Sequence, residues 1–399
     1  MFQFFGLDAS RKALGFRVNR VSQIDSNEER DLIIGDFNNY GFETKLLSEY
    51  DLLNTDAVFL LGLKYYKSKN TSRQGPGSAD IDADFNFYSG LYPYYSNQSS
   101  YLYPNTNVAF FGENIFQISD KLSVTPGLRL EYINTNADGY YKQIILDAAF
   151  NVISDKTINE IRTNKRVFML SGLGISYKHN SFLELYLNIS ENYRSVTFAD
   201  ISTINPAYAI NPNIKDESGF TFDVGTRGNF KKIISFDFSA FLLNYDNRIG
   251  FIQKALDDGN VKAYRTNTGN ALIYGMEGIA DINLRDIFSN SSQYNFNLFT
   301  NVSIINSEYV NSSETGVIGK SVEFVPNLNL KSGIKFGYKN ITSYLQYSFI
   351  SDQFSDSTNA IESNLSGLIG LIPAYDIVDV SFAYTFKKIK IECGVNNLL

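Results

Sequence analysis

The side chains of this chain that could do chemistry indicate ligand binding and form no catalytic set. Arg73 and Gln74, Arg194, and Arg265 occur in or beside segments that we interpret as long loops. Arginine presents planar, paired donors that fit a carboxylate, so the four residues are candidate ligand-binding residues for an anion. The alternative for any one of them is that it keeps a loop in solution, because charged loop residues are usually solvated.

The chain lacks the residues that other kinds of functional site need. Cys393 is the one cysteine and His179 the one histidine, so neither a disulfide framework nor a histidine-driven active site can form within the chain. Residues 80, 82 and 84 are aspartates that could hold a cation, but the glycine and bidentate glutamate of an EF-hand are absent. No nucleophile–base pair, phosphate-binding loop or dinucleotide fingerprint occurs. The sequence therefore predicts no enzyme, no cofactor and no metal site.

These candidates must be positioned by β-strands, because apolar and polar residues alternate along much of the chain. Residues 378–386 and 389–395 alternate with a period of two, and only Lys387 and Lys388 separate them, which predicts a hairpin. The same alternation recurs in residues 122–132, 183–190, 294–304 and 328–338. The polar faces carry charges at mid-strand, which a soluble sandwich would tolerate only outside: Arg129, Glu131, Glu184, Arg227, Asp237, Lys331 and Lys335.

Counting such stretches predicts about 14 strands with short and long connections in alternation, as in a membrane-spanning β-barrel. Residues 1–36 are charged and poorly periodic, so we expect them to be mainly loop. The expected long loops are residues 68–104, 136–164, 194–216 and 352–373, and the second of them has the alternative of a hairpin of its own near residues 143–153. The predicted strands are residues 37–53, 57–67, 106–118, 122–135, 165–178, 182–193, 217–229, 233–252, 263–283, 293–308, 324–338, 341–351, 378–386 and 389–395.

Composition agrees with a barrel and excludes other classes. Mean hydropathy is −0.17, and no apolar run approaches the roughly 20 residues that a spanning helix needs. The 27 tyrosines and 32 phenylalanines, without tryptophan, suit the aromatic girdles of a barrel. A net charge of −7 argues against a nucleic-acid partner.

Several short motifs resemble those of TonB-dependent outer-membrane receptors. Residues 211–217, NPNIKDE, resemble the Asn-Pro-x-Leu-Lys-x-Glu segment of that family. Residues 127–132 and 274–277 resemble two of its barrel strands, and residues 394–399 resemble its penultimate strand. Residues 111–114, together with residues 73–77, are most similar to the ferric-citrate-type branch.

This resemblance implies an all-β fold, a transmembrane antiparallel β-barrel of which residues 1–399 are one partial domain, with about 14 of 22 strands. The family's plug, its TonB-contacting motif and the closing strand are expected to lie outside the chain. The resemblance places the protein in the bacterial outer membrane, with Arg129, Glu131 and Arg227 facing the lumen and plug.

The partners that the resemblance implies are an iron chelate (ferric citrate or a similar siderophore), the TonB complex through the absent N-terminal region, and outer-membrane lipid. The expected function is energised uptake of the chelate, and Arg73, Gln74, Arg194 and Arg265 are the expected ligand contacts. The alternative is a non-energised outer-membrane barrel, such as a porin or an adhesin.

Overall fold

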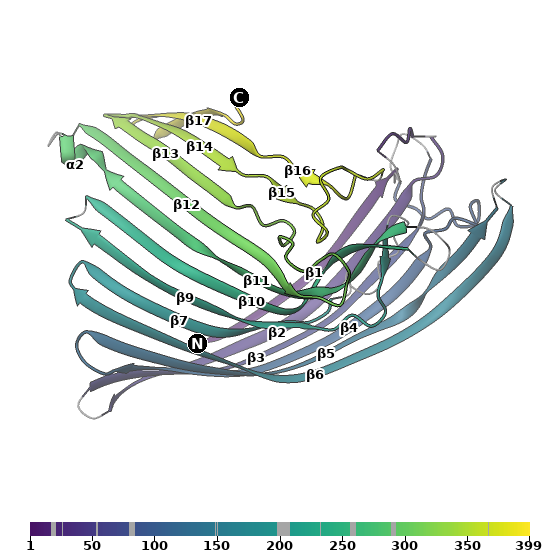
Figure 1. The fold of residues 1–399 in the computed structure, drawn as a ribbon, viewed down its shortest axis with the longest axis horizontal. Coiled ribbons are helices and arrows are strands. Elements are labelled where there is room, and N and C mark those ends of the chain that lie inside the picture. The colour runs from purple at the N-terminus through teal and green to yellow at the C-terminus, as the bar shows by residue number, and fades with distance from the viewer. Residues whose placement is uncertain are drawn as a thin grey trace.

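A computed structural model describes residues 1–16, 21–25, 27–52, 55–79, 84–147, 149, 151–197, 208–231, 233–255, 261–288, 293–365 and 367–399. The chain forms one strongly curved sheet whose neighbouring strands are antiparallel, apart from one short parallel strand (Figure 1). The sheet follows chain order from β1 to β18, which are its two edges. The predicted fold class, an all-β antiparallel barrel sheet, is confirmed.

The strands are long, and most are joined to their sequence neighbours. Among the described residues no helix is long and apolar enough to cross a membrane. The elements are β1 (Phe2–Gly15), β2 (Asp31–Leu52), β3 (Thr55–Pro76), β4 (Ser99–Gln117), β5 (Leu122–Leu146), β6 (Val152–Asn180), β7 (Leu183–Arg194), β8 (Tyr208–Ile210), β9 (Glu217–Phe230), β10 (Ile234–Ala255), β11 (Val261–Asn283), α2 (Leu284–Phe288), β12 (Tyr294–Asn311), β13 (Leu328–Tyr338), β14 (Ile341–Ile350), β15 (Gln353–Phe354), β16 (Leu371–Ile372), β17 (Tyr375–Phe386) and β18 (Ile389–Val395).

Two expectations about strand extent were wrong. The sheet has 16 strands, not about 14, because β1 forms within the expected loop of residues 1–36, where it pairs with β2 along its whole length, and the short β8 forms within the expected loop of residues 194–216 and pairs with β11. The strands also extend into the expected long loops: β3 continues to Pro76, and β5 and β6 pair to Leu146 and Val152. Polar residues there lack apolar alternation but still pair their backbones, so the pattern did not show them.

Cross-strand register separates one apolar face from one polar face. Side chains paired across an antiparallel sheet lie on the same face. One row of paired residues on the apolar face crosses seven strands: Ile175, Leu187, Val224, Ala240, Met276, Ile304 and Leu328. The adjacent row lies on the polar face: Ser176, Tyr186, Gly225, Ser239, Glu277, Ser303 and Asn329. In a membrane-spanning barrel the apolar face is the outer one.

On the polar face, aromatic rings lie across glycines of the next strand, among them Phe111 across Gly62 and Tyr186 across Gly225. A Cβ added to Gly62 would come within 2.2 Å of the Phe111 ring, and one added to Gly225 would come within 2.5 Å of Tyr186. An arginine lies over each ring. Arg129 is 5.4 Å from the centroid of Phe111, and Arg227 is 5.5 Å from the centroid of Tyr186. These glycines let large rings lie flat against the sheet.

The pairing of β6 with β7 ends well before either strand does. The last pair is Gly172 with Ser190, whereas β6 continues to pair with β5 as far as Val152. Just beyond the last pair, the Glu191 carboxylate accepts hydrogen bonds from the backbone N–H and the hydroxyl of Ser171, both at 2.7 Å. A side chain therefore takes the place of the next backbone partner.

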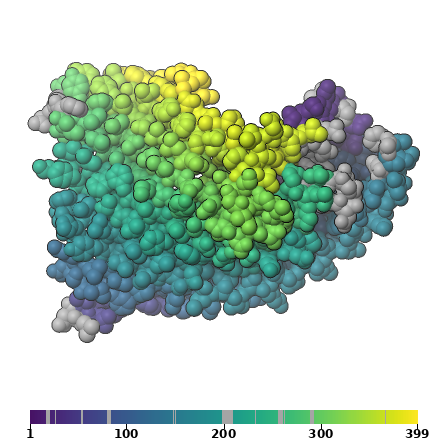
Figure 2. All heavy atoms as spheres, in the orientation of Figure 1, coloured from purple at the N-terminus to yellow at the C-terminus, as the bar shows by residue number. Residues whose placement is uncertain are grey.

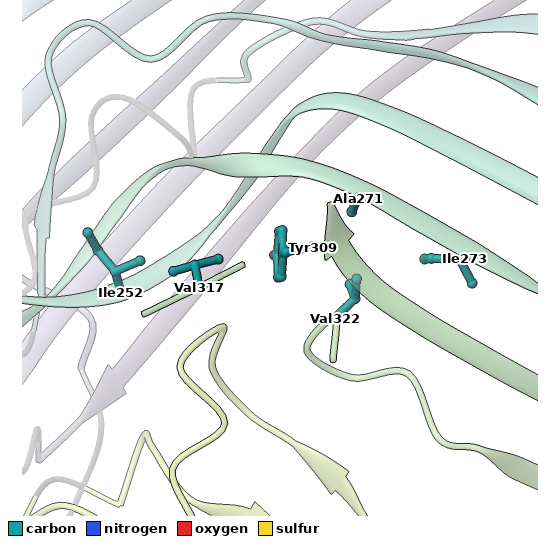
Figure 3. Close-up of a cluster of buried hydrophobic side chains, with 6 residues drawn as sticks. All are labelled: Ile252, Ala271, Ile273, Tyr309, Val317 and Val322. Atoms are coloured by element: carbon teal, nitrogen blue, oxygen red, sulfur yellow. The ribbon is translucent and has the colours of Figure 1, made fainter. Parts of the chain in front are cut away.

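The principal buried apolar cluster lies where the β12–β13 connection folds back over β10, β11 and β12, not in the middle of the sheet (Figure 3). We call this end, which carries the long connections, the loop end. The cluster consists of Ile252, Ala271, Ile273, Tyr309, Val317 and Val322. The β14–β17 connection lies against the β12–β13 connection, and Asn359 and Ser321 exchange two hydrogen bonds at 2.7 and 2.9 Å (Figure 2).

Candidate ligand-binding site at the loop end

Arg73 and Gln74 lie within strand β3 and not in a loop, which corrects their expected setting. The alternation of β3 places Arg73 on the face of Leu61 and Leu63, so it is directed to the outside of the sheet, where it contacts Asp36 at 3.5 Å. Gln74 has the opposite direction and is 8% exposed. The structure therefore does not bring these two neighbours to one site.

The amide of Gln74 is engaged by a buried carboxylate. Its Nε2 donates to both oxygens of Asp31 at 3.1 Å, and the Tyr95 hydroxyl donates to the same carboxylate at 3.1 Å. This contact ties the start of β2 to the end of β3. Of the three aspartates considered for a cation, Asp84 accepts hydrogen bonds from the backbone of Asn86 and the Tyr88 hydroxyl, and the other two lie outside the described residues.

Arg194 lies at the last position of β7, opposite Glu217, the first residue of β9. Its Nη1 donates to the Glu217 carboxylate at 2.7 Å, and the backbone N–H of Ile249 donates to the same oxygen at 2.7 Å. The glutamate side chain is 6% exposed and the arginine side chain 41% exposed. A buried carboxylate thus fixes an arginine that still reaches solvent at the loop end.

Arg265 lies on β11 opposite Phe251 of β10, and its guanidinium is 5.2 Å from the centre of that ring. Ile249, which donates to the partner of Arg194, precedes Phe251 by two positions on β10. Arg194 and Arg265 therefore lie at the same end of the sheet, on strands β7 and β11 that β9 and β10 separate, and β3 with Arg73 lies four strands from β7 on the other side.

A second buried ion pair lies beside the first. Glu323 is 5% exposed and Arg248 20% exposed, and their side chains are 3.4 Å apart. The Tyr309 hydroxyl donates to Glu323 at 2.6 Å and is itself 2.9 Å from the Thr268 hydroxyl. A Cβ at Gly250 would approach the Glu323 carboxylate to 2.5 Å, so this glycine leaves room for the carboxylate. The contacts tie the β12–β13 connection to β10, β11 and β12.

The NPNIKDE segment is held against β11 by its own polar groups. The backbone N–H of Asn211 donates to the Arg265 carbonyl at 2.9 Å, and its side chain donates to Thr266 at 2.9 Å. Asn267 accepts from the Lys215 backbone N–H at 2.8 Å and donates back to the Lys215 carbonyl at 2.9 Å. The motif therefore places Glu217 where it meets Arg194.

Asp216, the neighbour of Glu217, is bound by an arginine of a different strand, β6. Arg166 of β6 and the Tyr193 hydroxyl both donate to its carboxylate, and the backbone of Val196 donates to it at 2.7 Å. Burial raises the pKa of Asp216, but these hydrogen bonds outweigh burial and hold the pKa below its ordinary value. The paired carboxylates of the motif therefore bind arginines from two different strands.

The predicted lumen residues lie on the polar face and pair with one another. Arg129 donates to Glu131 at 2.6 Å. Arg227 makes two hydrogen bonds to Glu184, at 2.8 and 3.2 Å. Asp237 accepts a hydrogen bond from Tyr186 at 2.6 Å. These charged side chains thus contact partners on the same face and make that face hydrophilic.

Three residues of the loop-end site were not found from the sequence. Arg248, Tyr309 and Glu323 carry no spacing signal, since Arg248 and Glu323 are 75 positions apart. Glu217 was within the recognised motif, but its role as the partner of Arg194 follows only from the pairing of β7 with β9.

Comparison with known proteins gives one family over almost the whole chain. The family model described as "TonB dependent receptor-like, beta-barrel" matches residues 4–398. No curated protein matches.

Solved structures of similar fold include three metal transporters. The ferric citrate transporter FecA in its unliganded form is similar with a TM-score of 0.70 at 16% identity, over 100% of this chain and 54% of that one. The ferric yersiniabactin uptake receptor FyuA from Yersinia pestis gives 0.68 at 14%, over 100% and 54%. The copper transporter OprC gives 0.69 at 14%, over 100% and 56%. The chain spans about half the length of these structures, and at such identities the likeness shows the fold alone.

Proposed function

Because the chain belongs to the TonB-dependent receptor β-barrels of the bacterial outer membrane, we propose that it forms part of an importer for an anionic iron chelate such as ferric citrate or a similar siderophore. This family consists of transporters and not of enzymes. Uptake is proposed to depend on energy supplied through TonB, which other parts of the full-length receptor would contact.

The observation that carries the proposal is the match of the chain to the barrel family over residues 4–398. The loop-end site supports an anionic cargo, because Arg194 and Arg248 lie there, each beside a buried glutamate. Arginine recognises carboxylates through paired donors, and citrate-type chelates present carboxylates.

A chelate is favoured over a bare copper ion by the donors of this chain. Copper(I) prefers soft sulfur ligands, and copper(II) prefers imidazole. The chain has 3 methionines, 1 cysteine and 1 histidine. Among the described residues no group of three or more histidine, cysteine, aspartate or glutamate side chains could hold a metal ion. The ligand is therefore proposed to arrive with its metal already chelated.

The test is uptake of radioactive iron by cells that express the full-length native receptor, with and without functional TonB. We expect uptake of at least one carboxylate-rich ferric chelate that stops without TonB, and no uptake of copper salt. Uptake that is unchanged without TonB would favour the alternative, a passive outer-membrane barrel. Uptake of copper alone would contradict the chelate.

Arg194→Ala in the full-length receptor is expected to weaken binding of the carboxylate chelate about tenfold, because one hydrogen bond to a charged group contributes about 1.5–3 kcal/mol. The measurement is equilibrium binding of ferric citrate and related chelates to purified receptor. Arg73→Ala removes the same charge from the outer side of β3 and serves as the matched control. Equal binding by the Arg194→Ala variant and the parent would place the ligand elsewhere.

A further inference from the structure

The outer, apolar face of β3 to β6 carries a row of residues unlike the corresponding row elsewhere. Cross-strand pairing joins Tyr40, Lys67, Thr106, Asn134 and Lys165 in one row on this face, and Lys69 follows on β3 in the next row towards the loop end. All three lysines are exposed, and among the described residues none has a carboxylate partner. The nearby acidic groups on this face are Asp8, Asp36 and Asp138.

The row next to these lysines, towards the middle of the sheet, is aromatic and aliphatic. Its paired members are Phe42, Tyr65, Val108, Tyr132 and Val167. Phe42 and Tyr65 stack with their ring centres 5.7 Å apart. Tyrosines and phenylalanines of this kind mark the boundary between hydrocarbon and headgroups. The lysines therefore lie at headgroup level on the loop-end side.

In the opposite part of the sheet, the described residues of the corresponding row include no lysine. There, the row next to the apolar band consists of Glu191, Phe220, Asn244, Leu272 and Glu308. This row contains two glutamates, whereas the row described above contains lysines on β3 and β6. The positive charge of these lysines thus lies in one sector of the outer face, on the strands β3 to β6, which are side by side in the sheet (Figure 1).

An apolar groove lies in the same sector. It has a volume of about 430 Å³ and is lined mainly by Leu61, Phe110, Gly112, Leu128, Leu130 and Met169. Gly112 pairs with Leu61 and Leu128, so the missing side chain deepens the surface between them. Leu61 and Lys67 are six positions apart, about 20 Å along a strand, which is within reach of an acyl chain.

From the lysine row and the groove together, we propose that β3 to β6 form a binding site for one class of membrane lipid, an outer-leaflet lipid with a phosphate headgroup. Lys67, Lys69 and Lys165 contact the phosphate, and an acyl chain occupies the groove at Gly112. Basic clusters at headgroup level attract anionic lipids in this way. The positive charge of the lysines indicates an anionic headgroup. The apolar groove in the same sector indicates that this anion belongs to a lipid and is not free in solution.

The experiment uses the full-length receptor in phosphatidylcholine vesicles with trace spin-labelled phosphatidic acid or phosphatidylcholine. Electron paramagnetic resonance gives the preference of the immobilised lipid. We expect a several-fold preference for phosphatidic acid, which falls with each lysine removed and is lost when Lys67→Gln, Lys69→Gln and Lys165→Gln are combined. The matched control removes three lysines of the polar face, by Lys64→Gln, Lys331→Gln and Lys335→Gln, and should retain the preference.

The groove is tested by Gly112→Leu, which fills it; the nearest atoms to an added Cβ are Leu60 O at 3.3 Å and Leu61 Cδ1 at 3.4 Å, a tight contact that shifts of a few tenths of an ångström relieve. This variant should also lower the preference, and heat-modifiable migration should show that every variant is folded. A preference that survives the three lysine substitutions, or that Gly112→Leu leaves unchanged, overturns the proposal. Displacement by inorganic phosphate beyond the effect of sodium chloride at equal ionic strength would instead indicate a site for free phosphate and overturn the lipid.

Discussion

Replacing Glu323 by alanine is expected to release the β12–β13 connection from the strands that it covers. The substitution leaves the Arg248 guanidinium and the fully buried Tyr309 without their carboxylate partner. Breaking a buried ion pair in this way costs about 3–5 kcal/mol, because the remaining charge is left unpaired in a dry site. The loss is expected locally, since the barrel sheet itself does not depend on this contact.

Hydrogen exchange of the folded receptor checks this result at two amides, one in the connection and one in the part of β12 that the connection covers. The backbone N–H of Val322 donates to Ser307 at 3.1 Å, and that of Tyr309 donates to Lys320 at 2.9 Å. Both should exchange at least a hundredfold faster in the Glu323→Ala variant, as about 3 kcal/mol requires. Glu314→Ala, in the same connection, is the control. Unchanged exchange in the Glu323→Ala variant would mean that the connection is held by its apolar contacts alone.

Leu330→Arg should give the second large effect, on insertion of the whole barrel. Leu330 lies on the apolar face, paired with Val302 and Phe349. An arginine facing lipid costs about 2–4 kcal/mol at the bilayer midplane and less near the interfaces. The measurement is urea-dependent folding of the full-length receptor into phosphatidylcholine vesicles.

The adjacent residue supplies the control for this substitution. Asn329 lies on the polar face opposite Ser303, so Asn329→Arg places the same charge in the water-facing interior and should cost much less. If the two variants fold equally well, the assignment of the two faces is refuted, and if Asn329→Arg is the worse, the faces are reversed.

The faces of the strands could be predicted from the sequence because a period of two fixes them wherever both faces differ in polarity. Leu187 and Leu328, which are apolar members of the alternating stretches 183–190 and 328–338, lie in the same cross-strand row on the apolar face. The extent of the strands could not be predicted, because alternation fades where both faces are in water. Arg73 was placed in a loop for this reason, although β3 continues beyond it.

The partners within the loop-end site were beyond prediction for a different reason. Arg194 meets Glu217 through the register of β7 with β9, and Arg248 meets Glu323 through a connection that folds back over the sheet. Such contacts depend on where distant segments finish in space. A single sequence shows which residues are charged, but not which of them lie buried beside a residue of opposite charge.

The early end of the β6–β7 pairing has a mechanical consequence. From Gly172 towards the loop end, β6 keeps its backbone pairing with β5 and has none with β7 among the described pairs, whereas β5 stays paired with β4 as far as Tyr141. Only residues 142–146 and 152–157 therefore form a two-stranded tip, and isolated two-stranded ribbons are marginally stable compared with wide sheets. Below this tip β6 and β7 are joined by side chains, among them Glu191 with Ser171, in place of backbone pairs. The sheet thus has a seam at its loop end that can open without breaking a backbone hydrogen bond between β6 and β7.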